Sequence, residues 1–213
     1  MAKRYRRQIS LQVSGRFARF TDVDTSADPR TYLVPPASAL RGMLKTLLHR
    51  NSLFVLPQRV EYLPYHDPVT QQDISTVETM PLSTYHIRLK NKPEPWFGAP
   101  VSSTLLYGVH YRVHYLVEGT QAHLDELEER IKTNNWDWTP YLGIRECVAT
   151  IRPVDDTPVL HGISILGEKI RVLPGGKEVE MPVRNGVLTY PPAVEQAFRQ
   201  DFYARMGIPE VQP

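Results

Sequence analysis

The chain has 213 residues, of which 41% are hydrophobic, so it can bury a sizeable core and wholesale disorder is excluded. Its one cysteine excludes an intrachain disulfide, and with no signal peptide or bilayer-spanning apolar stretch we expect a cytoplasmic protein that contacts no membrane. The net charge of +2 conceals an asymmetry, because residues 1–50 hold ten basic and three acidic side chains whereas the other 163 hold fifteen and twenty. This favours a local contact with a polyanion, the alternative being a basic arm kept for solubility.

The first predicted element is a strand followed by a basic segment. Apolar and polar residues alternate over residues 6–14, which is typical of a half-buried strand, and Gly15 is expected to end it. The segment that follows carries Arg16 and Arg19 beside aromatic residues. We therefore expect these two cations on a turn or an exposed face.

A helix is predicted over residues 36–50, where apolar side chains recur at helical spacing after a pair of prolines. Arg41, Lys45 and His49 follow one another at intervals of four and lie opposite the apolar stripe. They are therefore expected to reach outward. Because no acidic residue accompanies them, this face suggests an anionic partner.

Residues 52–63 predict a second strand, and the polar, proline-rich segment 62–104 is the least regular part of the chain. Within that segment an alternating run carries Arg88 and Lys90, and an inserted hairpin arm fits it better than a packed core element. The clearest strand follows over residues 106–118, where apolar and polar side chains alternate throughout.

A second helix is predicted over residues 119–135, with Thr120 as its N-cap and an acidic outer face that should point away from any polyanion. A turn and a strand follow in residues 136–154, which include Arg145. The C-terminal third contains two hairpin signals, Pro-Gly-Gly and Asn-Gly, and a final helix over residues 192–206.

The order of these elements is strand, helix, strand, arm, strand, helix, strand, which is the β-α-β-β-α-β arrangement of a ferredoxin-like α+β fold. We expect residues 1–153 to form this domain, with a hairpin insertion at about 62–104. Residues 154–213 are then a C-terminal β-meander extension, a hairpin and a helix packed on the same core. A four-stranded sheet backed by two helices is also how RNA-recognition modules are built.

No motif supports a metal site or nucleotide-dependent chemistry. His110 and His114 are the best-spaced histidines, but on a strand four residues cover roughly 13 Å, too far for two ligands of one ion. Nucleophile-elbow, phosphate-loop and dinucleotide-binding motifs are absent. Cys147 is expected to be a small buried apolar residue. We therefore expect no metal and no cofactor.

Basic and aromatic side chains are the remaining candidates for function. Cations bind phosphates and exposed rings stack on bases, and single-stranded RNA binding requires both. The candidate RNA-contacting cations are Arg16, Arg19, Arg41, Lys45, Arg88, Lys90 and Arg145. The rings interleaved with them are Phe17, Phe20, Tyr85, Trp96 and Tyr141, although any one ring is more often part of a core.

Three segments resemble the Cas-five family of CRISPR-associated proteins: GRFARFTD, YLVPPASALRGML and TPYLGIRECVATI. The resemblance extends over residues 7–153, and the C-terminal third adds nothing diagnostic. It implies a ferredoxin-like fold of the RAMP type with an inserted hairpin thumb. It also implies the role of holding the 5′ handle of the guide RNA (crRNA) in a type I Cascade surveillance complex. The partners would be the Cascade backbone subunit and the large subunit, with target DNA reached indirectly through the complex.

One branch of that family, from type I-C systems, also cleaves the precursor guide RNA, and the segment TLLYGVHYRVHYLV resembles this branch most. The branch uses a tyrosine near the end of the first helix and a Lys-His pair at the start of the second. Here the tyrosine falls on Leu48 or His49, and the pair falls on Ala122 and His123. Metal-independent cleavage needs a general base and a general acid, so His49 and His123 are the catalytic candidates if the protein is an endoribonuclease.

Three hypotheses therefore stand. The preferred one is a non-catalytic Cascade subunit that binds the crRNA handle. The alternative is a metal-independent endoribonuclease that generates that handle. The third is an RNA-binding domain with no CRISPR role.

Overall fold

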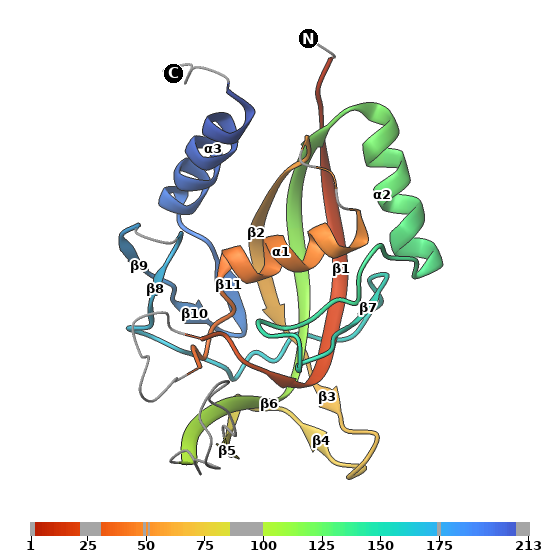
Figure 1. Cartoon of the computed structure of the whole chain (residues 1–213). Coiled ribbons are helices and arrows are strands. Elements are labelled where there is room, and N and C mark those ends of the chain that lie inside the picture. Colours follow the sequence, from red (N-terminus) through yellow and green to blue (C-terminus); the bar gives the residue numbers. More distant parts are fainter. Residues whose placement is uncertain are drawn as a thin grey trace, which may run out of the picture.

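A computed structural model gives the fold, with the elements labelled as in Figure 1. It describes residues 3–21, 31–48, 50, 52–85, 100–173 and 176–207. The main sheet consists of β1 (Tyr5–Ala18), β2 (Phe54–Tyr62), β5 (Glu78–Tyr85), β6 (Pro100–Gly119), β7 (Thr150–Arg152), β10 (Val183–Arg184) and β11 (Val187–Thr189). Its strands lie in the order β10-β11-β2-β6-β1-β7, and β5 pairs with β6 outside this path. The strand pairings are antiparallel, so the fold is mixed α/β with a mainly antiparallel sheet.

The helices are α1 (Ala37–Leu47), α2 (Gln121–Thr133) and α3 (Pro192–Met206). In Figure 1, α1 crosses in front of the sheet, α2 lies beside β1, and α3 lies on the β2 side. Two small hairpins complete the described structure: β3 (Tyr65–His66) with β4 (Asp73–Ile74), and β8 (Lys169–Arg171) with β9 (Glu178–Glu180). Within the described ranges, no helix is long and apolar enough to cross a membrane.

The core lies between the sheet and the helices. Val113, Tyr115 and Val117 alternate along β6 and are completely buried, and the Tyr115 hydroxyl donates to the Leu40 carbonyl oxygen of α1 at 3.2 Å. The apolar face predicted for residues 106–118 is therefore confirmed. The strand is longer than predicted, because its first part, from Pro100, pairs with β5.

Gly15 does not end β1, which corrects the sequence prediction. The strand continues to Ala18, and Gly15 pairs with Val109 of β6. A Cβ atom at Gly15 would lie 2.8 Å from the Leu142 side chain and 3.1 Å from the Val148 carbonyl oxygen. The glycine therefore allows residues 142–148 to pack directly on the strand, and this long-range contact is invisible in local periodicity.

The predicted second helix is confirmed in detail. The Thr120 side chain accepts a hydrogen bond from the His123 backbone N–H, as an N-cap does, and the helix ends at Asn134 in the left-handed conformation. Leu124, Leu127 and Ile131 form its buried face. The cap and the apolar spacing are local signals, which is why the sequence alone indicated them.

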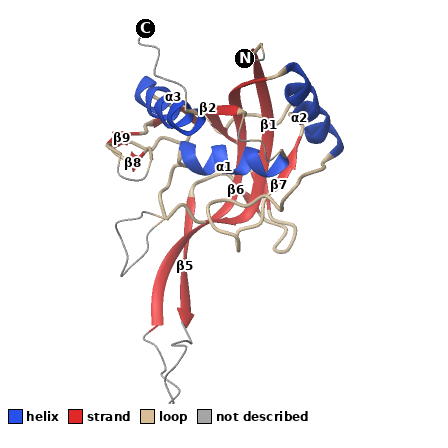
Figure 2. Cartoon of the chain, turned by 45° about the horizontal axis from the view of Figure 1, so that its top comes forward, coloured by secondary structure: helices blue, strands red, loops and turns tan. Residues whose placement is uncertain are grey.

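A hairpin formed by β5 and the first part of β6 projects from the rest of the chain, as Figure 2 shows. It occupies the place of the predicted hairpin arm. Arg88, Lys90 and Trp96, which were predicted to lie on this arm, fall outside the described residues, and so does the Tyr85 side chain.

The C-terminal part joins the same sheet. Asn185 and Gly186 have φ values of 52° and 74°, as a type I′ turn requires, and they connect β10 to β11. β11 then pairs with β2. The buried Phe198 and Phe202 of α3 belong to the same hydrophobic cluster as the core of β6.

Candidate RNA interface

Arg41 does not reach outward from α1, contrary to the sequence prediction. Its side chain is 13% exposed, and Nη1 lies 2.9 Å from Asp201 Oδ2 of α3. Its guanidinium also lies 4.3 Å from the centre of the Phe198 ring. The outward stripe was expected because α1 was considered by itself, whereas α3, 160 residues later in the chain, supplies both an aromatic and an anionic partner.

Lys45, one turn further along α1, is half-buried. Burial lowers the pKa of its ammonium, and the nearby charges of Arg41 and Arg205 lower it further. His49, the third predicted member of the stripe, lies outside the described residues. Of the predicted stripe, Arg41 is therefore enclosed against α3, and Lys45 is only partly exposed.

A groove lies on the other side of α1, between the helix and residues 136–148. It consists of two adjoining hollows that share Gly42 and Tyr141. We call it the α1 groove, and it is lined by Phe20, Thr21, Pro36, Ser38, Ala39, Gly42, Met43, Lys45, Thr46, Trp138, Thr139, Tyr141, Gly143, Ile144 and Arg145. A Cβ atom at Gly42 would meet no atom within 4 Å, so the groove is open at its middle.

Exposed rings and cations meet in the second hollow of the α1 groove. Trp138 is 65% exposed and Tyr141 is 36% exposed, and the Arg145 side chain is exposed beside them. Lys45 borders the same hollow. Sequence reasoning proposed Lys45, Arg145 and Tyr141, but it missed Trp138. The one signal was its place in the segment WDWTPY, close to the predicted Tyr141.

Backbone hydrogen bonds fix residues 136–148 against α1 and β1. The Trp138 N–H donates to the Thr46 carbonyl oxygen at 3.1 Å, and the Arg19 N–H donates to Leu142 at 3.0 Å. Within the segment, the Leu142 N–H donates to the Cys147 carbonyl oxygen at 2.8 Å. Cys147 is buried, which raises the pKa of its thiol to about 11. These hydrogen bonds and the buried Cys147 therefore hold residues 136–148 in a fixed position.

Gly143 sits at the point where this segment meets the end of β1. Its φ is +88°, and a Cβ atom there would lie 1.9 Å from the Arg19 carbonyl oxygen. Only glycine combines this conformation with so close an approach. The three sequence segments GRFARFTD, YLVPPASALRGML and TPYLGIRECVATI therefore come together at the α1 groove.

Arg16 is not at the α1 groove but near the base of the hairpin arm. Its Nε lies 3.2 Å from Oδ2 of Asp67, whose side chain is fully buried. A hydrogen bond from the Tyr107 hydroxyl, helped by the backbone N–H groups of Val69 and Thr70, lowers the pKa of the Asp67 carboxyl to about 2. Arg16 therefore serves as a counter-ion for Asp67.

The other predicted residues at the end of β1 and directly after it are largely enclosed. Arg19 is half-buried, and its Nε is buried with no hydrogen-bond partner among the described residues. Phe20 is a core residue at 2% exposure, and Phe17 is half-buried with its ring centre 5.8 Å from that of Tyr107. Of the predicted rings whose side chains are described, Tyr141 is the exposed one.

His123 lies at the start of α2, away from the α1 groove. Its Nδ1 is 3.4 Å from the Ser52 Oγ, so the start of α2 faces the loop that follows α1. Leu48, one of the two positions at which the resemblance placed a tyrosine, is 1% exposed and part of the core. The other, His49, is outside the described residues, so His123 is the one described histidine of the candidate pair.

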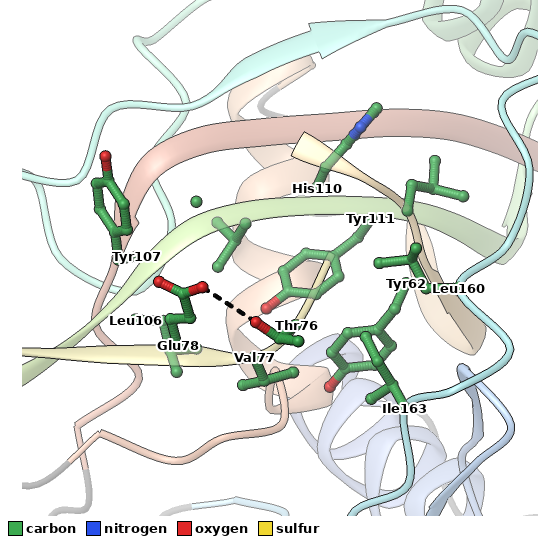
Figure 3. Close-up of a pocket in the computed structure, with 13 residues that line it drawn as sticks. Tyr62, Thr76, Val77, Glu78, Leu106, Tyr107, His110, Tyr111, Leu160 and Ile163 are labelled. Atoms are coloured by element: carbon green, nitrogen blue, oxygen red, sulfur yellow. Dashed lines mark hydrogen bonds between the residues drawn. The ribbon is translucent and has the colours of Figure 1, made fainter. Parts of the chain in front are cut away.

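A small cavity lies near the base of the hairpin arm (Figure 3). Its free volume of about 20 Å³ is enough for one water molecule. The Thr76 hydroxyl donates to the Glu78 carboxylate at 3.0 Å on one side, and Tyr62 and Tyr111 lie on the other. None of the predicted RNA-contacting residues lines it. Across the described residues, no group of three or more His, Cys, Asp and Glu side chains is arranged to hold a metal ion.

Comparison with known proteins places these features in context. Residues 8–206 match the family described as CRISPR-associated protein (Cas_Cas5). A curated relative, the CRISPR pre-crRNA endoribonuclease Cas5d of Thermus thermophilus, is 24% identical over 165 residues, which are 70% of this chain and 65% of the relative. The match thus spans less than two thirds of the relative's length.

Two solved structures resemble the chain over most of its length. One is the crystal structure of a CRISPR-associated protein, with a TM-score of 0.64 and 18% identity, covering 89% of this chain and 95% of the other. The second is a functionally uncharacterized protein from Streptococcus mutans, with a TM-score of 0.56 and 19% identity, covering 90% and 96%. At these identities the likeness shows the fold alone.

Proposed function

The chain belongs to the Cas5 family of CRISPR-associated proteins, and on that premise we propose that it binds the 5′ handle of crRNA as a subunit of a type I Cascade surveillance complex. The observation that carries this proposal is the α1 groove. It brings two exposed rings, Trp138 and Tyr141, together with two cations, Lys45 and Arg145.

These four side chains suit a single-stranded RNA. Flexible cations neutralise phosphates whatever the sequence, and exposed rings stack on bases that are not paired. Gly42 leaves the middle of the α1 groove open, so a strand can lie along α1 without meeting a side chain there. Arg88 and Lys90 remain part of the proposal as further phosphate contacts, whereas Arg41 faces α3 and is not one of them.

The finer fold assignment also belongs to the proposal. The order β7-β1-β6-β2 with antiparallel neighbours is the strand order of a ferredoxin-like β-α-β-β-α-β unit, in which α1 connects β1 to β2 and α2 connects β6 to β7. This supports a RAMP-type domain in which the projecting hairpin of β5 and β6 acts as the thumb.

The proposed partners follow from the proposed complex. They are crRNA, the Cascade backbone subunit and the large subunit, with target DNA reached through the complex, and a cytoplasmic setting. The hairpin arm is the proposed contact with a neighbouring subunit, because it extends away from the core of the chain (Figure 2). Shortening the arm by removing residues 82–103 should leave a folded protein that fails to join the complex. A variant that assembles normally would contradict the thumb assignment.

The stacking part of the proposal has a direct test. Single-stranded RNA from the cognate repeat should bind the Trp138→Ala/Tyr141→Ala variant about tenfold or more weakly than the unmodified protein, since each stacked base contributes roughly 1–3 kcal/mol. Tyr5→Ala is the matched control, because Tyr5 is 38% exposed but lies at the far end of β1. Equal binding by the double variant and the unmodified protein would exclude the α1 groove as the stacking site.

A second candidate function is precursor cleavage, favoured by the Thermus thermophilus relative and by the position of His123 beside the loop that follows α1. Binding without cleavage remains the proposal, because Leu48 is buried and an alanine occupies position 122. Incubation with repeat RNA and a chelator should leave the RNA intact. A single cut that is abolished by His123→Ala and by a 2′-deoxy substitution at the cut site would establish the endoribonuclease instead.

A further inference from the structure

A second pocket lies on the α3 side of α1. We call it the α1–α3 pocket, and it is lined by Arg41, Lys45, Leu53, Phe54, Val55, Asp201, Phe202, Arg205 and Met206. Its volume of about 150 Å³ is several times the ≈ 30 Å³ that one water occupies in the liquid, so it has room for a small anion.

Charge is unbalanced in the α1–α3 pocket. Arg41, Lys45 and Arg205 are basic, and Asp201 is the one acidic side chain in the lining. Asp201 already accepts hydrogen bonds from both arginines, at 2.9 Å from Arg41 and at 2.6 and 2.7 Å from Arg205. The lining therefore has three cations and one carboxylate, which is shared by the two arginines, and two positive charges remain uncompensated.

Lys45 accounts for one of these two charges. It makes no ion pair with any of the residues that the structure describes, and burial together with the charges of Arg41 and Arg205 lowers the pKa of its ammonium. A cation in this situation gains from any anion that enters the pocket. Phosphate is the anion that matches, since it carries between one and two negative charges and several acceptor oxygens.

We propose that the α1–α3 pocket is a phosphate-binding site, in which Lys45 and Arg205 contact one phosphate group and Arg41 is held in place by Phe198 and Asp201. The site goes beyond the proposed RNA path, because free phosphate can fill it without RNA. Lys45 is the one described residue that lines both this pocket and the α1 groove. A strand leaving the α1 groove therefore reaches the pocket by crossing Lys45, so the phosphate comes either from the RNA backbone or from solution.

Binding of inorganic phosphate to the full chain tests the site itself. Phosphate at ten times its dissociation constant should raise Tm by roughly 3–6 °C relative to chloride at equal ionic strength. Lys45→Ala and Arg205→Ala should lose most of this shift, whereas Lys132→Ala, which removes an exposed cation on α2, should keep it. A shift that is absent from the unmodified protein, or equal in all variants, would overturn the proposal.

Asp201→Asn should change phosphate affinity in the opposite direction. It removes the competing carboxylate while keeping the side-chain shape, so phosphate should bind several-fold more tightly if the fold is retained. Circular dichroism and the Tm in chloride show whether it is retained. If Asp201→Asn folds but binds phosphate no better than the unmodified protein, Asp201 does not share its cations with the ligand and the proposed site is wrong.

The source of the phosphate is distinguished with RNA in which single linkages are replaced by neutral methylphosphonates. If the RNA backbone supplies the group, replacement at one linkage should weaken binding to the unmodified protein, and the same replacement should have little further effect on Arg205→Ala. If the losses add at every linkage while inorganic phosphate still raises Tm, free phosphate is the ligand. Arg145 lines the α1 groove and not the α1–α3 pocket. RNA binding by Arg145→Ala therefore tests the handle-binding proposal, whereas the Tm shift with inorganic phosphate tests the pocket.

Discussion

On one side of α1, Arg41 is closed in by α3, whereas on the other side Trp138 and Arg145 are exposed at the α1 groove. Both sides are basic, and the sequence pattern does not separate them. The difference comes from the neighbouring elements, because α3 supplies a carboxylate and a ring for Arg41, whereas Arg145 of the 136–148 segment is exposed and has no ion pair among the described residues. A basic stripe on a helix therefore predicts an anionic neighbour, and that neighbour can be part of the same chain.

The largest expected effect on stability comes from Gly143, which allows residues 136–148 to pack closely against the end of β1. Gly143→Ala should lower the free energy of unfolding by about 2–4 kcal/mol, because the added methyl group meets the Arg19 carbonyl oxygen at a positive φ. Gly42→Ala is the matched control, since its methyl group enters open space and alanine favours the helix by up to about 1 kcal/mol. Urea denaturation measures both, and equal losses would contradict the assigned role of Gly143.

The next effect separates the two sides directly. Arg41→Ala should lower the free energy of unfolding by about 1–3 kcal/mol, because it removes a partly buried ion pair and a contact with the Phe198 ring. Arg145→Ala should change stability by less than about 0.5 kcal/mol, as is usual for exposed side chains. Thermal unfolding of both variants checks the contrast. If Arg145→Ala is as destabilising as Arg41→Ala, the assignment of Arg145 to an exposed surface is wrong.

The smallest effect is the dependence of the closed side on pH. Burial opposes ionisation of Asp201, yet hydrogen bonds from Arg205 and Arg41 lower the pKa of its carboxyl below the ordinary value. A lowered carboxyl pKa contributes stability above the unfolded value of about 3.9 and loses it as the pH falls below that value. Unfolding between about pH 6 and pH 3 should therefore be less pH-dependent in Asp201→Asn. Identical slopes would show that Asp201 is not stabilised by its partners.

Much of the fold followed from local patterns. Alternation identified the buried face of β6, a cap residue and apolar spacing identified α2, and an Asn-Gly pair identified the β10–β11 turn. Gly15 was wrongly predicted to end the strand. A glycine is needed there because the side chain of Leu142, which is distant in sequence, packs directly against it. Local signals therefore predicted which helices and strands form, whereas long-range contacts determined where β1 ends.

The candidate site was predicted less completely. Arg145 and Tyr141 were predicted as a cation and an interleaved ring suited to RNA, and both are exposed at the α1 groove. Arg41 was expected to be exposed, but its partners lie on α3, about 160 residues away, and no periodicity in residues 36–50 reveals them. Trp138 was overlooked, and its sequence neighbourhood does not distinguish it from Trp136, which packs against the core.

The salt dependence of RNA binding tests the account most directly. The affinity of the full chain for single-stranded repeat RNA should fall with increasing salt, and Arg145→Ala should reduce the slope of log affinity against log salt by about 0.7–1, the value expected for one lost phosphate contact. Lys132→Ala, on the outer part of α2, should leave the slope unchanged. Parallel lines for Arg145→Ala and the unmodified protein would contradict the claim that the α1 groove holds the RNA.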